Sequence, residues 1–297
     1  MKSLIIQMVE MFEKVLIPTD FSKYSEKVLE CVGGLPGVRD VVLLHVIGPA
    51  DPLARVWDPG ARIEDSKKML AEHERFLGGH ALNIRTRIET ITEGDISRVI
   101  QRVADEEECS AIIMGARGKG IIEGILLGSI AKNVLRYGNT NLLLMRYRAM
   151  EGRSGPSLER FCSQLFSKVL CPTDFSEPAE NAIASIREIK GIGEVLLQYV
   201  VFRGETWKDI EANSEEAAKK LNAVREGLEK AGLKVDTRVS VGNPAEEISA
   251  LAEKEDVSLI MMSSHGRGWI KQLVVGSTTY DVARTSDRPV LVIRAGA

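Results

Sequence analysis

The stretch KVLIPTDFS at residues 14–22 recurs as KVLCPTDFS at residues 168–176, with eight of nine residues identical at an offset of 154. A second pair of matching stretches lies near the end of each copy. Residues 112–146 align without a gap on residues 260–294, at an offset of 148. Because two separate anchors repeat in the same order, the chain contains two copies of one structural unit.

The change of offset places an insertion of six residues in the first copy, and we expect it in the Pro- and Gly-bearing stretch 48–60. The sequence EGRSGP at 151–156 has the composition of a linker. A chain of 297 residues suits two domains of ordinary size. We therefore predict equivalent domains at 1–150 and 151–297.

Strand and helix signals alternate within each copy. Runs such as VVLLHV and VSLIMM are apolar at consecutive positions, as expected for strands buried on both faces. Asn243-Pro244, and Asp95 in the first copy, are predicted helix N-caps. Alternating strands and helices predict an α/β fold with a doubly wound parallel sheet in each domain. The predicted strands lie at 14–19, 39–47, 83–91, 110–115, 141–146, 168–173, 193–201, 234–240, 258–263 and 289–294, and the helices of the first copy near 22–34, 61–79, 95–108 and 127–137.

Composition and charge disfavour several classes of partner. A net charge of −3 gives no electrostatic reason to expect nucleic acid or an anionic membrane, and the 5% aromatic content supplies few platforms for base stacking. The N-terminal segment MKSLIIQMVEMF is interrupted by Gln7 and Glu10, is too short to span a bilayer and has no cleavage site after it. We expect it to form a short amphipathic helix, and we expect the protein to be cytoplasmic.

Cysteine and histidine spacing gives no sign of a metal centre. Cys31, Cys109, Cys162 and Cys171 contain no CxxC pair, so we expect reduced, buried thiols. The four histidines are scattered at positions 45, 73, 80 and 265, which disfavours a structural metal site.

Ligands of open parallel sheets bind beyond the carboxyl ends of the strands. Asp20 and Asp174 follow the first strand of each copy, where a carboxylate can accept hydrogen bonds from ribose hydroxyls or an adenine amine. The alternative is that each aspartate only caps the next helix, alone or beside Ser22 or Ser176.

Glycines follow the fourth strand of the first copy. Gly115, Gly118 and Gly120 precede Gly128-Ser129, which opens a helix. Glycine lets backbone N–H groups approach phosphate oxygens, and a helix start adds free amides and a positive dipole end. The sequence thus predicts that amides at Gly118 and Gly128-Ser129 converge on one phosphate. An ordinary flexible loop is the alternative, which the recurrence of the spacing at Gly266, Gly268 and Gly276-Ser277 disfavours.

The combination of PTDFS, LLHV and G-x2-G-x9-G-S resembles the universal stress protein family, over almost the whole chain and twice. No G-x-x-x-x-G-K-[ST] motif occurs, so a P-loop enzyme is unsupported, and GKGIIEG at 118–124 has one residue too many for a dinucleotide fingerprint. The resemblance implies strand order 3-2-1-4-5 in each domain, an adenine nucleotide α-hydrolase-like fold and pairing of the last strands, LLLMR (142–146) with PVLVIR (289–294), as an intrachain pseudo-dimer. A further homodimer is also an expectation.

The resemblance also implies which residues contact AMP or ATP. The aspartates contact the nucleoside, the valines at the end of the second strand contact adenine through their backbone, and the glycine motif holds the phosphates. Arg117 is either a phosphate contact or an ordinary surface arginine. The implied residues of site one are Pro18, Thr19, Asp20, Val46, Gly115, Arg117, Gly118, Gly128, Ser129 and Ile130, and those of site two are Pro172, Thr173, Asp174, Val200, Ser263, His265, Gly266, Gly276, Ser277 and Thr278.

The second copy departs from the motif at one position, where Ser263 replaces Gly115 and either crowds the ligand or adds a hydrogen bond. Tyr199 replaces His45, and both are expected to pack or cap. We therefore expect site one to be the stronger site.

The predicted function is that of a nucleotide-responsive sensor in a stress response, with Mg²⁺ accompanying a bound triphosphate. Slow ATP hydrolysis and a ligand-free scaffold are the alternatives. No nucleophile–base pair supports the first, and the intact glycine motif of the first copy disfavours the second.

Overall fold

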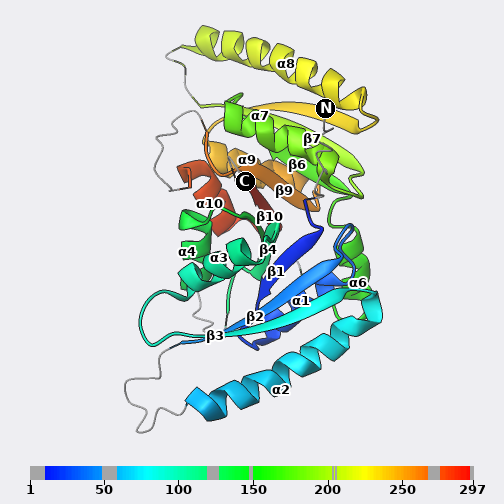
Figure 1. Ribbon diagram of the computed structural model, residues 1–297. Helices are drawn as coiled ribbons and strands as arrows, with labels where there is room; N and C mark the ends of the chain where they lie inside the picture. The colour runs from blue at the N-terminus through cyan, green and yellow to red at the C-terminus, as the bar shows by residue number, and fades with distance from the viewer. Residues whose placement is uncertain are drawn as a thin grey trace, which may run out of the picture.

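The computed structural model describes residues 11–48, 59–118, 127–146, 150–202, 204, 206–266 and 275–294 (Figure 1). Most of the expected N-terminal helix and of the expected insertion at 48–60 lies outside the described residues, as do Gly120, Gly268 and Trp269.

Ten strands form one continuous sheet in the order β3-β2-β1-β4-β5-β10-β9-β6-β7-β8. Each half therefore has the predicted order 3-2-1-4-5, and its strands are parallel. The halves join where β5 and β10 pair antiparallel, with Leu143 opposite Leu291, which confirms the expected pairing of the last strands. The strands are β1 (Lys14–Pro18), β2 (Asp40–Ile47), β3 (Asn83–Thr90), β4 (Ala111–Gly115), β5 (Asn141–Met145), β6 (Lys168–Pro172), β7 (Glu194–Val201), β8 (Lys234–Val241), β9 (Leu259–Ser263) and β10 (Val290–Ile293).

Helices cover both faces of the sheet, as the apolar strands require. One face packs against α1 (Lys23–Val32), α2 (Pro59–Leu77), α6 (Pro156–Ser163), α7 (Glu177–Ala184) and α8 (Trp207–Glu229). The other packs against α3 (Ile96–Glu106), α4 (Ser129–Tyr137), α9 (Pro244–Lys254) and α10 (Ser277–Thr285). Two short 3₁₀ helices, η1 (Gly78–His80) and η2 (Ser185–Glu188), complete the described elements.

Both predicted N-caps are present. The Asp95 carboxylate accepts a hydrogen bond from the Ser97 amide at 2.8 Å, and the Asn243 side chain accepts from Ala245 and Glu246. Each cap satisfies amides that a helix start leaves without an intrahelical acceptor. The caps determine where α3 and α9 begin. Both helices begin at the edge of the sheet where the candidate sites lie.

The cysteine expectation was wrong for one pair. Cys31 of α1 and Cys162 of α6 form a disulfide, with a Cα–Cα distance of 5.2 Å, within the usual range. The two residues are 131 positions apart, and only the packing of α1 against α6 brings them together. Cys109 and Cys171 are free and buried, and burial raises the pKa of the Cys109 thiol to about 11.

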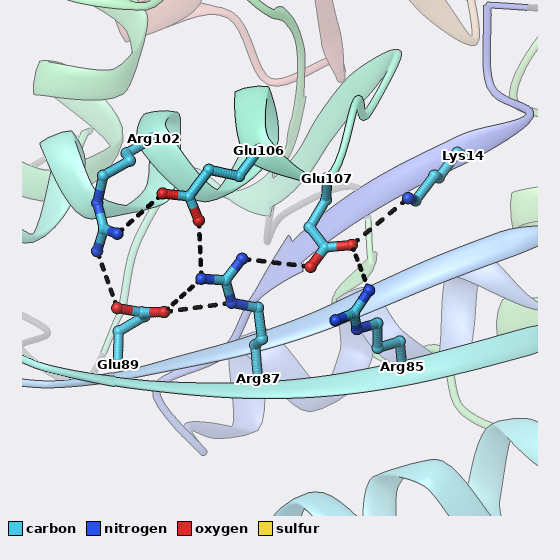
Figure 2. Close-up of polar contacts among 7 residues, drawn as sticks. All are labelled: Lys14, Arg85, Arg87, Glu89, Arg102, Glu106 and Glu107. Carbon is cyan, nitrogen blue, oxygen red and sulfur yellow. Dashed lines mark hydrogen bonds and ion pairs between the residues drawn. The ribbon is translucent and has the colours of Figure 1, made fainter.

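A network of ion pairs ties β3 to α3 in the first domain (Figure 2). Arg87 of β3 contacts three carboxylates, those of Glu89 at 2.7 Å, Glu106 at 2.8 Å and Glu107 at 3.2 Å. Glu107 has only 6% of its side chain exposed and also contacts Lys14 and Arg85. Between β3 and the end of α3, the contacts are therefore ion pairs between charged side chains.

Within the described parts of the chain, no helix is both long and apolar enough to cross a bilayer.

Candidate functional site

The aspartate after the first strand is held by its own loop. In the first domain, the Asp20 carboxylate accepts a hydrogen bond from the Ser22 amide at 3.0 Å. Ser22, not Asp20, is the N-cap of α1, because its hydroxyl accepts from the Ser25 amide. Asp174 repeats this arrangement with the Ser176 amide. In the first domain the alternative, that Asp20 caps the helix alone or beside Ser22, is therefore wrong as to the cap itself; in the second, Ser176 is the N-cap of α7 but makes no side-chain cap hydrogen bond.

Both aspartates lie against the glycine loop. A Cβ atom at Gly118 would lie 2.6 Å from Oδ2 of Asp20, closer than such contacts occur, and one at Gly266 would collide with Oδ2 of Asp174. Glycine at these positions leaves room for the carboxylate. The end of the first strand and the loop after the fourth strand thus meet in each domain, as expected for neighbouring parallel strands.

The helix start after the loop has the predicted geometry with one difference. Gly128 is the N-cap of α4 and provides no side chain to accept from the first amides, and Gly276 is the equivalent N-cap of α10. The Gly128 amide itself donates to the Ala116 carbonyl at 2.8 Å. Gly128 therefore closes the loop instead of contributing its amide to a phosphate. The amides that face the N-terminal end of α4 are those of Ser129 and Ile130.

In the second domain these elements line a cavity of about 800 Å³, within the range of small-molecule sites. All ten residues predicted for site two contribute to its wall, which are Pro172, Thr173, Asp174, Val200, Ser263, His265, Gly266, Gly276, Ser277 and Thr278. They come from the ends of β6, β7 and β9 and from the start of α10. The structure therefore gathers residues that are more than 100 positions apart in the sequence around one cavity.

The corresponding residues of the first domain occupy equivalent elements. Pro18 ends β1 and Thr19 follows it, and the Thr19 amide donates to the Leu44 carbonyl in the neighbouring strand. Val46 lies near the end of β2 and packs against the core. The backbone of Arg117 lies next to Gly115 and Gly128, so it belongs to the same loop.

Ser263 does not leave its hydroxyl to the cavity. Its Oγ donates to the carbonyl of His265 at 2.6 Å, so the serine braces the loop that follows β9. A Cβ atom at Gly115 would likewise lie 3.1 Å from the Arg117 carbonyl. This hydrogen bond is made to the protein, so the expectations that Ser263 crowds a ligand or adds a hydrogen bond there stay predictions.

His45 and Tyr199 pack, as expected. The His45 ring lies 4.3 Å from the Phe21 ring, and Nδ1 of His45 lies 2.8 Å from the Thr19 carbonyl. Tyr199 stacks on Phe175 with ring centroids 4.9 Å apart. Phe21 and Phe175 have positive φ angles of 57° and 58°, so both follow the aspartate in a strained left-handed turn.

Several other residues that line the cavity of the second domain were not predicted from the sequence. The start of α9 contributes Asn243, Pro244, Ala245 and Ile248, and β7 contributes Gln198, with Phe202 directly after it. Asn243 was recognised as a cap, and the rule for carboxyl edges of parallel sheets extends to the β8–α9 turn, so this part was accessible to inference. Gln198 and Phe202 carry no such signal, because the first copy has Leu44 and Gly48 there.

A model of the universal stress protein family matches the chain twice, over residues 11–146 and 165–294. The chain belongs to the universal stress protein family. The domain boundary at 150/151 falls between the two matched regions and stays a prediction.

The family assignment agrees with individual relatives. A universal stress protein of Methanocaldococcus jannaschii is 35% identical over 157 residues, which cover 44% of this chain and 97% of the relative. A universal stress protein of Mycolicibacterium smegmatis is 25% identical over 302 residues, covering 94% of this chain and 96% of the relative. The crystal structure of a universal stress protein from Archaeoglobus fulgidus matches with a TM-score of 0.70 at 26% identity, covering 96% of this chain and 98% of that one. The tandem arrangement thus recurs in full-length relatives.

Proposed function

We propose that this tandem universal stress protein binds an adenine nucleotide in each domain and acts as a nucleotide-responsive regulator. The observation that carries the proposal is the repeated juxtaposition of three parts: a carboxylate, a glycine loop against it and an uncapped helix start. In the second domain, Asp174, Gly266 and Ser277 all line the same cavity.

The three parts match the three parts of a nucleotide. The carboxylate of Asp174 is placed to accept hydrogen bonds from ribose hydroxyls, and the apolar side chains of Met262 and Ile248 offer a surface for a base. The amides of Ser277 and Thr278 begin α10 without a side-chain cap, where the helix dipole favours a phosphate. Asp20, Gly118 and Ser129 repeat the polar half of this arrangement in the first domain.

The proposal includes AMP or ATP as the ligand, with Mg²⁺ accompanying ATP, and a cytoplasmic location. Most cytosolic proteins keep their thiols reduced. Because Cys31 and Cys162 form a disulfide, the cysteines give no support for a cytoplasmic location. We also propose that the whole chain forms a homodimer and that a downstream protein partner senses the bound nucleotide.

The experiment is a calorimetric titration of the purified chain with AMP and with ATP plus Mg²⁺, preceded by chromatography of small molecules released on denaturation. We expect adenine nucleotide in the released material at one or two equivalents, or binding heat with the added nucleotide.

Two variants test the site itself. Gly128→Val and Gly276→Val each place a branched side chain at a helix start, where a Cβ atom meets no protein atom closer than 3.5 Å, so the fold should tolerate it. Each variant should lose one of two binding events. Gly227→Val, on α8 where a Cβ atom meets nothing within 4 Å, is the matched control and should bind like the parent. Absence of released nucleotide and of binding heat in the parent would favour the ligand-free scaffold, and steady phosphate release lost in Asp20→Ala would favour the hydrolase.

A further inference from the structure

The two phosphate cradles, defined as Gly118, Gly128 and Ser129 in the first domain and Gly266, Gly276 and Ser277 in the second, are connected through the helices that begin at them. Helices α4 and α10 lie on the same face of the sheet, near the β5–β10 junction (Figure 1), and the end of α4 meets the start of α10. The amide of Val275 donates to the carbonyl of Arg136 in the last turn of α4, at 3.2 Å. Val275 directly precedes Gly276 and lines the second cavity. The first domain therefore accepts a hydrogen bond from the edge of the second cradle.

The Arg136 side chain makes a second contact to the same place. Its guanidinium lies 5.3 Å from the ring centroid of Tyr280, in the distance range of a cation–π contact. Tyr280 lies in the first turn of α10, and its amide donates to the Gly276 carbonyl at 2.9 Å. Arg136 thus touches α10 on both sides of the helix start, through its backbone at Val275 and through its side chain at Tyr280.

The end of α4 that carries Arg136 is itself fixed from the other domain. The buried guanidinium of Arg294 donates to the carbonyls of Val134 at 3.0 Å and Leu135 at 2.8 Å. The Val134 carbonyl also accepts from the Gly138 amide at 3.0 Å, whereas the Leu135 carbonyl is one of those that a helix end leaves without an intrahelical donor. Arg294 and Val275 therefore contact adjacent carbonyls at the same end of α4. Along α4, Arg136 lies about 10 Å from Ser129 of the first cradle, at a rise of about 1.5 Å per residue.

The end of α10 also contacts the first domain, through a side chain. At the end of α10, the guanidinium of Arg146 donates to the carbonyls of Ala283 at 3.1 Å and Arg284 at 3.0 Å. Arg284 is the repeat counterpart of Arg136, and its carbonyl is taken by Arg146. The carbonyl of Arg284 thus accepts from a side chain of the first domain, whereas that of Arg136 accepts from the backbone of the second cradle's edge.

We propose that Arg136 is a positioning residue of the second cradle, and that a ligand in the first cradle changes the affinity of the second through α4. This inference rests on the proposed function. A phosphate bound at the start of α4 fixes the helix along its axis, and the helix end carries the two contacts to Val275 and Tyr280. By linkage, a ligand in the second cradle then changes the affinity of the first by the same factor.

The test measures the nucleotide affinity of each cradle separately in the full-length chain. In Gly128→Val only the second cradle binds, and in Gly276→Val only the first, each titrated with AMP and with ATP plus Mg²⁺. Adding Arg136→Ala to Gly128→Val should weaken binding about two- to fivefold, the loss expected for one partly buried cation–π contact. Adding it to Gly276→Val should leave the affinity unchanged. Arg136→Lys should restore part of the loss, because an ammonium group also binds a ring face.

Arg284→Ala is the matched control, since it removes the same residue type from the same position of α10. Arg284 has 44% of its side chain exposed and pairs only weakly with Asp281, at 3.5 Å, so both affinities should stay within twofold of the parent. The coupling is the ratio of second-cradle affinities with the first cradle filled and with it blocked. We expect about fivefold or more in the parent and a clearly smaller ratio after Arg136→Ala, which removes the contact to Tyr280 and keeps the backbone bond from Val275.

The outcomes distinguish a failure of this inference from a failure of the proposed function. If Arg136→Ala affects both cradles equally or neither, or if the parent shows a ratio of one, the inference is overturned while the proposed function stands. If the parent binds neither nucleotide, the proposed function fails and the inference fails with it.

Discussion

Replacing Arg87 by methionine tests whether the ion-pair network of Figure 2 stabilises the first domain. Arg87 has 24% of its side chain exposed and contacts Glu107, which has only 6% exposed. Lys14 and Arg85 still contact Glu107 after the substitution, so the remaining charge is not left without a partner. Hydrogen bonds to charged groups contribute about 1.5–3 kcal/mol each when partly buried, and the surviving partners offset part of the loss. We expect the free energy of unfolding to fall by about 2 kcal/mol.

The repeat offers a matched control. Arg238 of the second domain is the counterpart of Arg87, but its side chain is 42% exposed and its ion pairs are with Asp236 at 3.0 Å and Glu255 at 3.8 Å. Arg238→Met should cost about 0–1 kcal/mol, as exposed pairs do. Urea unfolding of the full chain, followed by circular dichroism, measures both. Equal losses for the two variants would refute the argument from burial.

The same network sets a dependence on pH. Burial acts to raise the pKa of Glu89, but hydrogen bonds from Arg102 and Arg87 outweigh it, and the pKa lies below its usual value. A carboxyl with a lowered pKa in the folded state contributes stability that is present above its unfolded pKa, about 4.3, and lost as pH falls through the folded value. The difference between the parent and Arg87→Met should therefore shrink below about pH 4. A difference that stays constant down to pH 2 would contradict this.

Three further predictions concern single residues. Gly118→Ala should displace the Asp20 carboxylate, which is 2.6 Å from the new Cβ, and weaken nucleotide binding at the first site about tenfold with little change in Tm, as measured by calorimetry. Reducing the disulfide in the parent, or replacing Cys31 and Cys162 by alanine, should lower the free energy of unfolding by about 3–5 kcal/mol, because the closed loop is long, and a reductant should then have no effect on the variant's Tm. Burial lowers the pKa of His73, so the parent should lose stability relative to His73→Gln as pH falls below about 6.5; a gap that is the same at pH 7.5 and 5.5 would argue against it.

Local signals in the sequence were sufficient for the elements and for part of the site. Consecutive apolar residues located the strands, and Asp95 and Asn243 located two helix starts, because both depend on neighbours a few residues away. The adjacency of Asp20 to Gly118 also followed, since parallel strands bring their carboxyl ends to one edge.

Contacts between distant segments could not be inferred in this way. The Cys31–Cys162 disulfide depends on α1 packing against α6, and no spacing of the cysteines indicates it. The bond from Val275 to Arg136 depends on the angle at which the two domains pair, which the apolar pattern of β5 and β10 does not specify. The Gly128 amide was misassigned because it donates to the Ala116 carbonyl twelve residues earlier, a bond that the spacing of the motif does not indicate.

A crystal structure of the full chain grown with excess AMP or ATP tests the central claim most directly. The account predicts phosphate density within hydrogen-bonding distance, about 2.7–3.2 Å, of the Ser129 and Ile130 amides or of the Ser277 and Thr278 amides, with the ribose beside Asp20 or Asp174. Only solvent at both helix starts, with the nucleotide absent or bound elsewhere, would contradict it.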